Sequence, residues 1–237
     1  MMIKECLILA GGLGTRLRGV INDIPKPMAP ISGKPFLEFL LRYLSSQGME
    51  RIVLSVGYLK EKIIEHFGSN FMGMEIVYSV EEEPLGTGGA ILKARDLLGE
   101  AFFVLNGDTL FMIDLRELYE FYARKCADVV IALRKMEDCS RYGSVVIDQD
   151  GRIKGFIEKG KMGECLINGG VYVVSKGILD KVNFPVPFSW ERDFLERYYE
   201  DFNIYGLLCE GYFIDIGTPE DYGRANDELP RLDIICL

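Results

Sequence analysis

Apolar runs alternate with helix-like apolar repeats over the first 110 residues of the chain. The segments Cys6–Ala10 and Ile52–Val56 are almost continuously apolar, as strands covered on both faces are. Between them, the apolar residues from 37 to 44 recur at helical spacing and stop at Gly48. The same patterns predict further strands at 76–78 and 102–105 and helices at 59–67 and 86–98. This order predicts an α/β fold with a mostly parallel sheet and helices on both faces.

The pattern is looser in the second half of the chain. Strand-like segments lie near 128–133, 144–147, 153–157, 167–174 and 203–208, and helix-like segments near 114–125, 191–200 and 218–228. No linker or low-complexity tract separates the two halves. We therefore predict a single domain over residues 1–237, whose second half adds strands and a small substrate lobe.

Charge is spread unevenly along the chain. The 237 residues carry a formal net charge of −9, which excludes a general binder of nucleic acid polymers or anionic membranes. No apolar run approaches the ~20 residues of a membrane span, so no membrane association is expected. Residues 11–34, however, contain Arg16, Arg18, Lys26 and Lys34 against Asp23 alone. This cationic segment predicts a small anionic ligand.

The cysteines and the histidine exclude several kinds of site. Six cysteines are scattered without a CxxC pair, and His66 is the single histidine. A zinc site and a Cys–His nucleophile are therefore poorly supported. The expected picture is a reduced, cytoplasmic protein whose cysteines are mostly small core residues.

A glycine-rich loop follows the first predicted strand. Gly11, Gly12 and Gly14 allow backbone N–H groups to approach a phosphate closely, and Arg16 could clamp it. The Rossmann fingerprint fails because Leu17 stands where its last glycine belongs, which disfavours a nicotinamide-dependent dehydrogenase. The Walker A pattern fails as well. A plain tight turn is the alternative, and the neighbouring cations favour phosphate binding over it.

Two aspartates follow apolar segments. Asp108 comes after the predicted strand at 102–105, so it should stand at the carboxyl edge of the sheet, where ligands bind in open α/β folds. Asp215 ends the apolar segment Phe213–Ile214. Carboxylates suit Mg²⁺, although either residue could equally cap a helix or stabilise a turn. The residues alone do not bring positions 108 and 215 together.

Motifs along nearly the whole chain resemble those of sugar-1-phosphate nucleotidyltransferases. They are LAGGLGTRLRGVINDIPKPMAPISGKPFLEFLLRYL from Leu9, EPLGTGGAI (83–91), LNGDTLF (105–111), RYGSV (141–145), FIEKG (156–160), INGGVY (167–172), FSWERDFL (188–195) and YFIDIGTPEDY (212–222). Within that family, GVINDIPKPMAPI and EPLGTGGA are most similar to guanylyltransferases acting on D-glycero-α-D-manno-heptose 1-phosphate. The resemblance implies a three-layer, Rossmann-like sheet with a nucleotide half of about 1–110 and a sugar-phosphate half of about 111–230.

The resemblance also implies roles for the nucleotide side. Arg16, Lys26 and Asp108 would be catalytic, and Asp108 and Asp215 would share Mg²⁺. The nucleotide would be bound by Leu9, Ala10, Gly11, Gly12, Gly14, Thr15, Gly86, Thr87 and Gly88. Glu81 is a candidate acceptor for the N–H groups of guanine, although residues 81–83 could equally be a solvated charge run.

The sugar 1-phosphate side follows in the same way. The resemblance assigns Gly143, Glu158, Lys159, Asn168 and Gly169 to it, but Gly160 replaces a proline common after Lys159. Trp190 could stack on a sugar ring or be a core residue. Glu191 and Asp193 could reach the sugar or open a helix, where acids suit the dipole.

The implied activity is guanylyl transfer from GTP to heptose 1-phosphate, which yields GDP-heptose for surface polysaccharide synthesis. Mannose-1-phosphate guanylyltransferase and N-acetylmuramate-1-phosphate uridylyltransferase stay open, as does an inactive regulator that binds sugar nucleotides. No residue here is assigned to distinguishing heptose from mannose. Exposed apolar segments such as Phe71–Met72 and the tail at 234–237 permit a homodimer.

Overall fold

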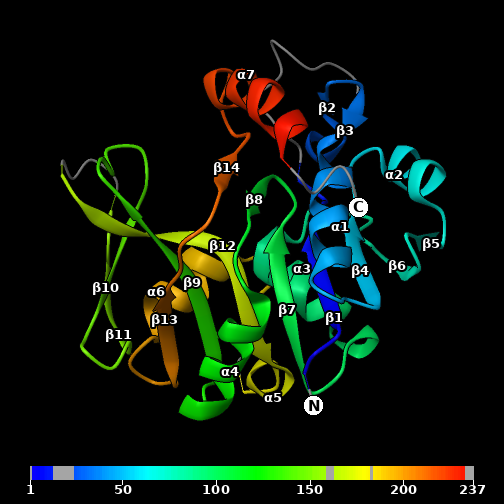
Figure 1. Ribbon diagram of the computed structural model, residues 1–237. Helices are drawn as coiled ribbons and strands as arrows, with labels where there is room; N and C mark the ends of the chain where they lie inside the picture. Colours follow the sequence, from blue (N-terminus) through cyan, green and yellow to red (C-terminus); the bar gives the residue numbers. More distant parts are fainter. Residues whose placement is uncertain (1, 13–23, 159–162, 182–183, 233–237) are drawn as a thin grey trace.

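The computed structural model describes residues 2–12, 24–158, 163–181 and 184–232. Its main feature is a ten-stranded mixed sheet (Figure 1). The first half of the chain contributes four parallel strands in the order β7 (Ala101–Asn106), β1 (Glu5–Leu9), β4 (Arg51–Val56) and β6 (Met74–Val80). The short strand β5 (Asn70–Phe71) closes this edge antiparallel to β6. These strands are apolar on both sides because helices cover both faces of the sheet.

The second half extends the sheet beyond β7 with a mixed arrangement. Its strands are β9 (Val129–Met136), β10 (Ser144–Ile147), β11 (Ile153–Ile157), β12 (Cys165–Ser175) and β13 (Ile204–Leu208). β12 runs antiparallel to β7 and to β9, and β13 runs parallel to β9. β10 and β11 form an antiparallel hairpin at the far edge of the sheet.

β12 changes its neighbour along its length. Residues Val171–Ser175 pair with β7, whereas Leu166 and Ile167 pair with β10. Its register against β9 shifts between Asn168 and Tyr172, which marks an irregularity where the strand passes from one neighbour to the other. The motif that resembles the sugar-contacting segment of the family lies at this point.

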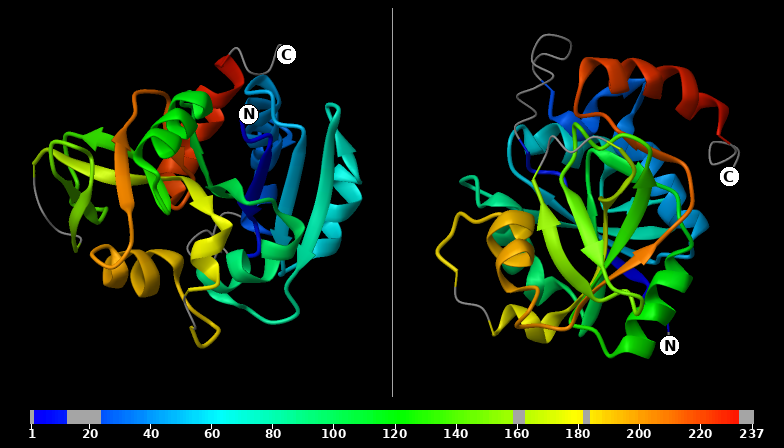
Figure 2. Two further views of the ribbon diagram at one scale, coloured as in Figure 1. Left: turned by 90° about the horizontal axis from the view of Figure 1, so that it is seen from below. Right: turned by 90° about the vertical axis from the view of Figure 1, so that its left-hand side faces the viewer.

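Helices cover both faces of the sheet (Figure 2). One face packs against α1 (Phe36–Ser46), α2 (Lys60–Phe67), α4 (Leu115–Lys125) and α7 (Pro219–Glu228). The other packs against α3 (Gly86–Ala94), α5 (Lys176–Leu179) and a π-helical turn (Trp190–Leu195) that continues into α6 (Glu196–Tyr198). Successive strand residues alternate between the two cores, as Leu7 and Ile8 do.

Two small two-stranded sheets lie beside the main one. The hairpin β2 (Pro30–Ile31) and β3 (Lys34–Pro35) precedes α1, and β8 (Thr109–Phe111) pairs antiparallel with β14 (Phe213–Asp215). Helix α7 packs on the first of these, since the Tyr222 hydroxyl donates a hydrogen bond of 2.5 Å to the Pro30 carbonyl. Short 3₁₀ turns occupy Lys26–Met28, Arg95–Leu97 and Leu229–Arg231.

The expected α/β class is confirmed, with helices on both faces and parallel pairing in the first half. The expected helix at 191–200 is only partly correct, because residues up to Leu195 form a π-helical turn that begins at Trp190. The sequence pattern did not predict the two- and three-residue strands, which are too short to show a periodicity.

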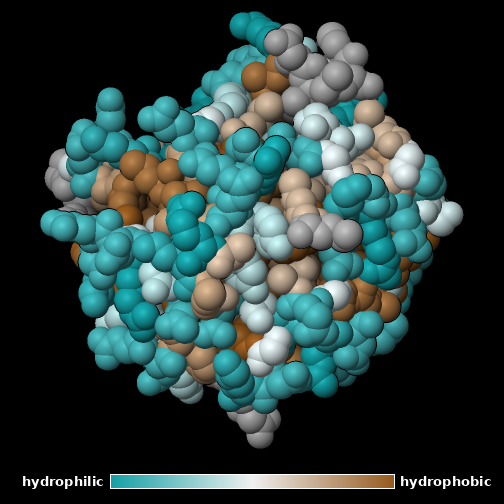
Figure 3. Space-filling view, turned by 60° about the horizontal axis from the view of Figure 1, so that its bottom comes forward, coloured by the Kyte–Doolittle hydropathy of each residue, from teal (hydrophilic) through white to brown (hydrophobic). Residues whose placement is uncertain are grey.

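The surface is mainly polar on the face shown in Figure 3, with apolar side chains in small patches. Met72 is 39% exposed, whereas Phe71 is half-buried and packs edge-on against Phe67. Among the described residues, no helix combines the length and apolar character that crossing a membrane requires.

Candidate active site

Lys26, Asp108 and Asp215 meet at the carboxyl edge of the sheet. The Lys26 ammonium donates a hydrogen bond of 2.5 Å to Asp108 Oδ2 and lies 3.8 Å from Asp215 Oδ1. Lys26 stands in the 3₁₀ turn before the β2–β3 hairpin, Asp108 follows β7, and Asp215 ends β14. The structure thus joins three residues that the sequence could relate only through the family resemblance.

Two backbone features explain this meeting. The Gly107 N–H donates to the Leu9 carbonyl at 3.0 Å, and a Cβ at position 107 would lie only 2.6 Å from that oxygen. Only glycine allows β7 to end so close to β1. The pairing of Thr109 with Asp215 then places the second carboxylate beside the first.

The environment of Asp215 disfavours its charged form. Burial raises the pKa of Asp215, and the negative charge of Asp108 raises it further, while Lys26 opposes both effects. The side chains of Lys26, Asp108 and Asp215 are 13%, 37% and 27% exposed. Among the described residues, Lys26 is the cation shared by these two neighbouring carboxylates, an electrostatic arrangement that a further cation would relieve.

The donor set fits Mg²⁺ held together with a phosphate. Asp108 and Asp215 supply hard oxygen ligands, which this ion takes in ones and twos alongside water and substrate oxygens. Over the described part of the chain there is no group of three or more histidines, cysteines or acids suited to a metal. The remaining ligands would therefore have to come from phosphate and water.

The start of the glycine loop lies at the end of β1. Ala10 is anchored by its N–H, which donates to the Ser55 carbonyl at 2.8 Å. A Cβ on Gly11 would lie 2.8 Å from Glu81 Oε1, whereas one on Gly12 would meet nothing within 4 Å. The expectations for Gly14, Thr15 and Arg16 lie outside the described residues.

Glu81 supports this loop. Its carboxylate accepts hydrogen bonds from the Ser55 hydroxyl at 2.7 Å and from the Leu85 N–H at 3.2 Å. Each oxygen therefore already has a donor inside the protein. Glu82, in contrast, is 77% exposed and paired with Lys60, in agreement with a solvated charge run at that position.

Gly86, Thr87 and Gly88 form the N-terminus of α3. Gly86 has a φ of +72°, and a Cβ on it would lie 2.3 Å from the Phe188 carbonyl oxygen. That oxygen accepts a hydrogen bond of 3.0 Å from the Gly88 N–H. The glycines thus let the segment around Phe188 lie directly on the helix end.

The residues expected on the sugar-phosphate side fall into two groups. Gly143 and Glu158 flank the paired residues Ser144 and Ile157, so they are neighbours at one end of the β10–β11 hairpin. Asn168 and Gly169 lie at the irregularity of β12. Lys159 lies outside the described residues.

Gly169 shows why this position cannot carry a side chain. A Cβ there would lie 2.4 Å from the Phe111 ring and 2.9 Å from the Ala132 carbonyl oxygen. Phe111 belongs to β8, which follows Asp108 directly. Close packing at Gly169 therefore connects β12 to the carboxylate cluster.

Trp190 corrects one expectation. Its side chain is 1% exposed and stacks on Phe194 with 4.4 Å between ring centroids. Its Nε1 has no hydrogen-bond partner. The indole is thus a core residue, the alternative that the sequence left open, and offers no face to a sugar ring.

Glu191 and Asp193, which the sequence treated alike, have different environments. Asp193 accepts a hydrogen bond of 2.8 Å from the Ser189 N–H and so opens the π-helical turn. Glu191 instead accepts from the hydroxyls of Thr87 and Tyr172, at 2.8 and 3.2 Å. Tyr172 was not a candidate, because an apolar strand pattern gives no reason to single out one buried tyrosine.

Arg141 is a further residue that the sequence analysis did not single out. It donates to the Thr218 hydroxyl at 3.2 Å and to the carboxylate of Asp221, which is 5% exposed. It joins the segment before β10 to α7, the helix after Asp215. The sequence signal was its place in RYGSV, two residues before Gly143.

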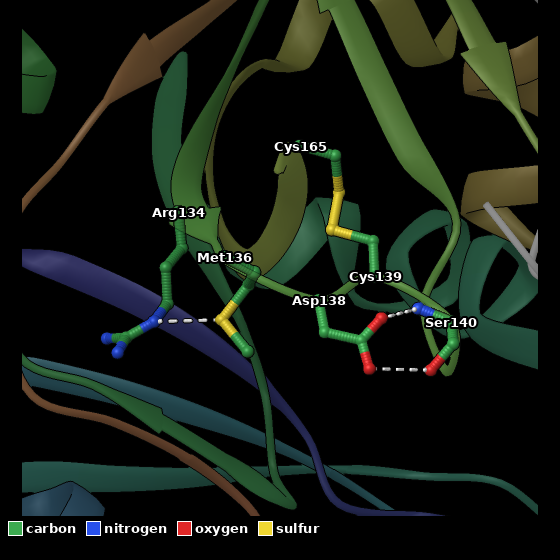
Figure 4. The surroundings of a disulfide bond; sticks show 6 residues. All are labelled: Arg134, Met136, Asp138, Cys139, Ser140 and Cys165. Carbon is green, nitrogen blue, oxygen red and sulfur yellow. Dashed lines mark hydrogen bonds between the residues drawn. A yellow bond between two sulfur atoms is a disulfide. The ribbon is translucent and has the colours of Figure 1, made fainter. Parts of the chain in front are cut away.

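The expectation of uniformly reduced cysteines is wrong for Cys139 and Cys165, which form a disulfide across 26 residues (Figure 4). No spacing motif pointed to this pair, because it depends on how β12 passes the loop before β10. Cys6, Cys126 and Cys209 are free thiols. The disulfide lies close in sequence to both groups of residues that the sequence predicts on the sugar-phosphate side, with Gly143 after one cysteine and Asn168 after the other.

Comparisons with known proteins agree with this geometry. The family model for nucleotidyl transferases matches residues 5–231. Two similar proteins are named D-glycero-alpha-D-manno-heptose 1-phosphate guanylyltransferase. The one from Aneurinibacillus thermoaerophilus is 48% identical, and the match covers 95% of this chain and 98% of the relative. The one from Campylobacter jejuni is 45% identical, and the match covers 92% of this chain and 96% of the relative. The crystal structure of HddC from Yersinia pseudotuberculosis complexed with GMP-PN superposes with a TM-score of 0.86 at 41% identity, covering 95% of this chain and 99% of that one.

Proposed function

Because the chain belongs to the nucleotidyl transferase family, we propose that it transfers the guanylyl group of GTP to D-glycero-α-D-manno-heptose 1-phosphate. The products are GDP-heptose and pyrophosphate. The proposal is supported by two relatives that carry this name and cover nearly the whole chain, and by a solved neighbour whose crystals contain GMP-PN.

The observation that carries the proposal is the contact of Lys26 with Asp108 and Asp215 beside the start of the glycine loop. Asp108 and Asp215 would hold Mg²⁺, which supplies charge neutralisation between the reacting phosphates. Lys26 and Arg16 neutralise the negative charge that develops on the departing pyrophosphate.

The chemistry needs no nucleophile from the protein. An oxygen of the sugar 1-phosphate forms the new bond to the α-phosphorus of GTP, and the bond from that phosphorus to pyrophosphate breaks. The attacking oxygen is already anionic, so no general base has to remove a proton. The task of the protein is alignment and charge neutralisation.

Each half of the chain binds one of the two substrates. Residues 1–110 hold the nucleotide, through Leu9 to Thr15 and through Gly86 to Gly88. Residues 111–230 hold the sugar phosphate, through the hairpin residues Gly143, Glu158 and Lys159 and through Asn168 and Gly169 of β12. Support comes from the described residues of both sets, because Gly11 and Gly12 follow the carboxyl end of β1 and Gly169 packs against Phe111, close to Asp108.

A pyrophosphate-release assay tests the function. The enzyme is supplied with Mg²⁺, with each of GTP, ATP, CTP, UTP and dTTP, and with heptose 1-phosphate, mannose 1-phosphate or N-acetylmuramate 1-phosphate. The highest kcat/KM is expected for GTP with heptose 1-phosphate. Preference for mannose 1-phosphate or for UTP would identify one of the two alternative enzymes, and no release with any pair would favour a sugar-nucleotide-binding regulator.

Removal of the metal is a second test. Chelation with EDTA is expected to abolish pyrophosphate release, and added Mg²⁺ is expected to restore it. Full activity in EDTA would reject the role of Asp108 and Asp215 as metal ligands. Size-exclusion chromatography with light scattering, run on the same samples, tests whether the chain forms the homodimer that its exposed apolar segments permit.

A further inference from the structure

The Glu191 carboxylate ends two chains of hydrogen bonds that come from opposite sides of the site. On the nucleotide side, the backbone N–H of Trp190 donates to the Thr87 hydroxyl at 2.8 Å, and that hydroxyl donates to Glu191 Oε2 at 2.8 Å. On the sugar-phosphate side, the Asn168 amide donates to the Tyr172 hydroxyl at 2.9 Å, and that hydroxyl donates to Glu191 Oε1 at 3.2 Å.

The direction of every bond in these chains is fixed by chemistry. Asn168 Oδ1 accepts from the Gly170 N–H at 2.9 Å, so the amide can offer only its NH₂ to Tyr172. Tyr172 and Thr87 each accept one hydrogen bond and must donate their proton onward. Only a group that accepts on both sides can end both chains, and an ionised carboxylate is such a group.

The network is held in a tightly packed part of the molecule. Tyr172 is fully buried, and burial next to the charge of Glu191 raises its pKa well above the ordinary value, so its hydroxyl keeps its proton. The Ser189 hydroxyl adds a third hydrogen bond to Glu191, at 3.2 Å. Glu191 therefore has hydroxyl partners on α3, on β12 and on its own turn.

We propose that Glu191 is a positioning residue for the transfer reaction. It fixes the N-terminus of α3 relative to Asn168 and Gly169, so that the bound nucleotide and the bound sugar phosphate meet with their reacting atoms in line. This inference rests on the proposed function, which assigns these two segments to the two substrates. Misplacement of reacting groups by about 1 Å costs roughly 10²-fold in rate, so alignment is where such a residue acts.

The test compares kcat with the KM values of both substrates in variants of this network. Glu191→Gln places an NH₂ group against a hydroxyl that must donate, and Tyr172→Phe cuts the link to Asn168 without removing the ring. Each is expected to lower kcat about 10- to 100-fold while both KM values stay within about threefold, as lost alignment requires. Thr87→Val should lower kcat to the same extent, and Thr87→Ser, which keeps the hydroxyl, should recover kcat relative to it; because Thr87 lies in the nucleotide-binding segment, only kcat and the KM for the sugar phosphate are compared for these two variants.

Asp193→Asn is the matched control. Asp193 lies on the same turn as Glu191, but its carboxylate accepts a hydrogen bond from the Ser189 N–H. The variant should therefore lower the melting temperature and leave kcat unchanged. A loss of stability without loss of kcat in Glu191→Gln and Tyr172→Phe would overturn the proposal and leave a structural role. A selective rise in KM for the sugar phosphate at unchanged kcat would overturn it as well, because Glu191 would then be a substrate-binding group.

The wild-type enzyme, assayed alongside, separates this proposal from the proposed function. Variants are compared with it on whichever nucleotide and sugar phosphate it uses best. If the wild type prefers another nucleotide and sugar phosphate, the substrate assignment is rejected, but the proposal for Glu191 can still be tested. A wild type that uses no pair overturns both.

Discussion

Reduction of the Cys139–Cys165 disulfide should destabilise the whole protein and weaken its sugar-phosphate side. The bond closes a loop of 26 residues that contains the β10–β11 hairpin. The chain-entropy relation gives about 3.5 kcal/mol for a loop of this length. For a protein of this size that corresponds to a fall of roughly 7–14 °C in melting temperature. Because Gly143 follows Cys139 closely, KM for the sugar phosphate should rise severalfold as well.

Melting curves with and without dithiothreitol measure the effect. Cys165→Ser should melt where the reduced wild type melts and should not respond to the reductant. Cys126→Ser, which removes an exposed free thiol, is the control and should keep the response of the wild type. An oxidised wild type that melts at the same temperature as its reduced form would refute the reasoning, since the bond would then restrict nothing in the unfolded chain.

Three further predictions concern the carboxylate cluster and its surroundings. Lys26→Met should lower kcat on the order of 10²–10³-fold with an unchanged circular dichroism spectrum; a kcat within threefold of the wild type would reject its role. The raised pKa of Asp215 means that its ionisation costs more in the folded than in the unfolded chain, so its contribution to stability is lost as the pH rises through the folded pKa. In EDTA, Asp215→Asn should therefore melt above the wild type at pH 7, and the difference should shrink as the pH falls towards 4; a lower melting temperature at pH 7 would contradict this sign. Gly169→Ala should cost about 1–3 kcal/mol in urea unfolding, because the new methyl group would lie 2.4 Å from the Phe111 ring, and a neutral result would show that the ring moves freely.

Local patterns were sufficient to predict most of the main sheet. Buried strands such as β1 and β4 are continuous apolar runs, and α1 has a clear helical repeat. A few neighbouring residues are therefore enough to identify each of these elements. The strands of the second half were also found near their observed positions. Their order in the sheet was not, since β12 pairs with β7, β9 and β10 through contacts far apart in sequence.

The candidate site was predictable only where a motif carried it. Asp108 could be placed at a strand end from its own neighbours, but its meeting with Asp215 depends on β8 and β14, which have three residues each. Cys139 and Cys165 pair through a contact that no spacing encodes. Glu191 and Asp193 differ only in which way a π-helical turn directs them, and sequence offers no signal for that.

The pairing of β7 also affects how the chain is synthesised. One side of β7 pairs with β1, and its other side pairs with Val171–Ser175 of β12. The ribosome must therefore add about 70 residues after β7 before that second side is covered, which takes roughly 4–14 s at the usual rate of elongation. During this interval the apolar strand AFFVLN presents an open edge, the kind of surface from which intermolecular aggregation begins. This interval is therefore the point of synthesis at which a chaperone that covers the free edge of β7 would protect the nascent chain from aggregation.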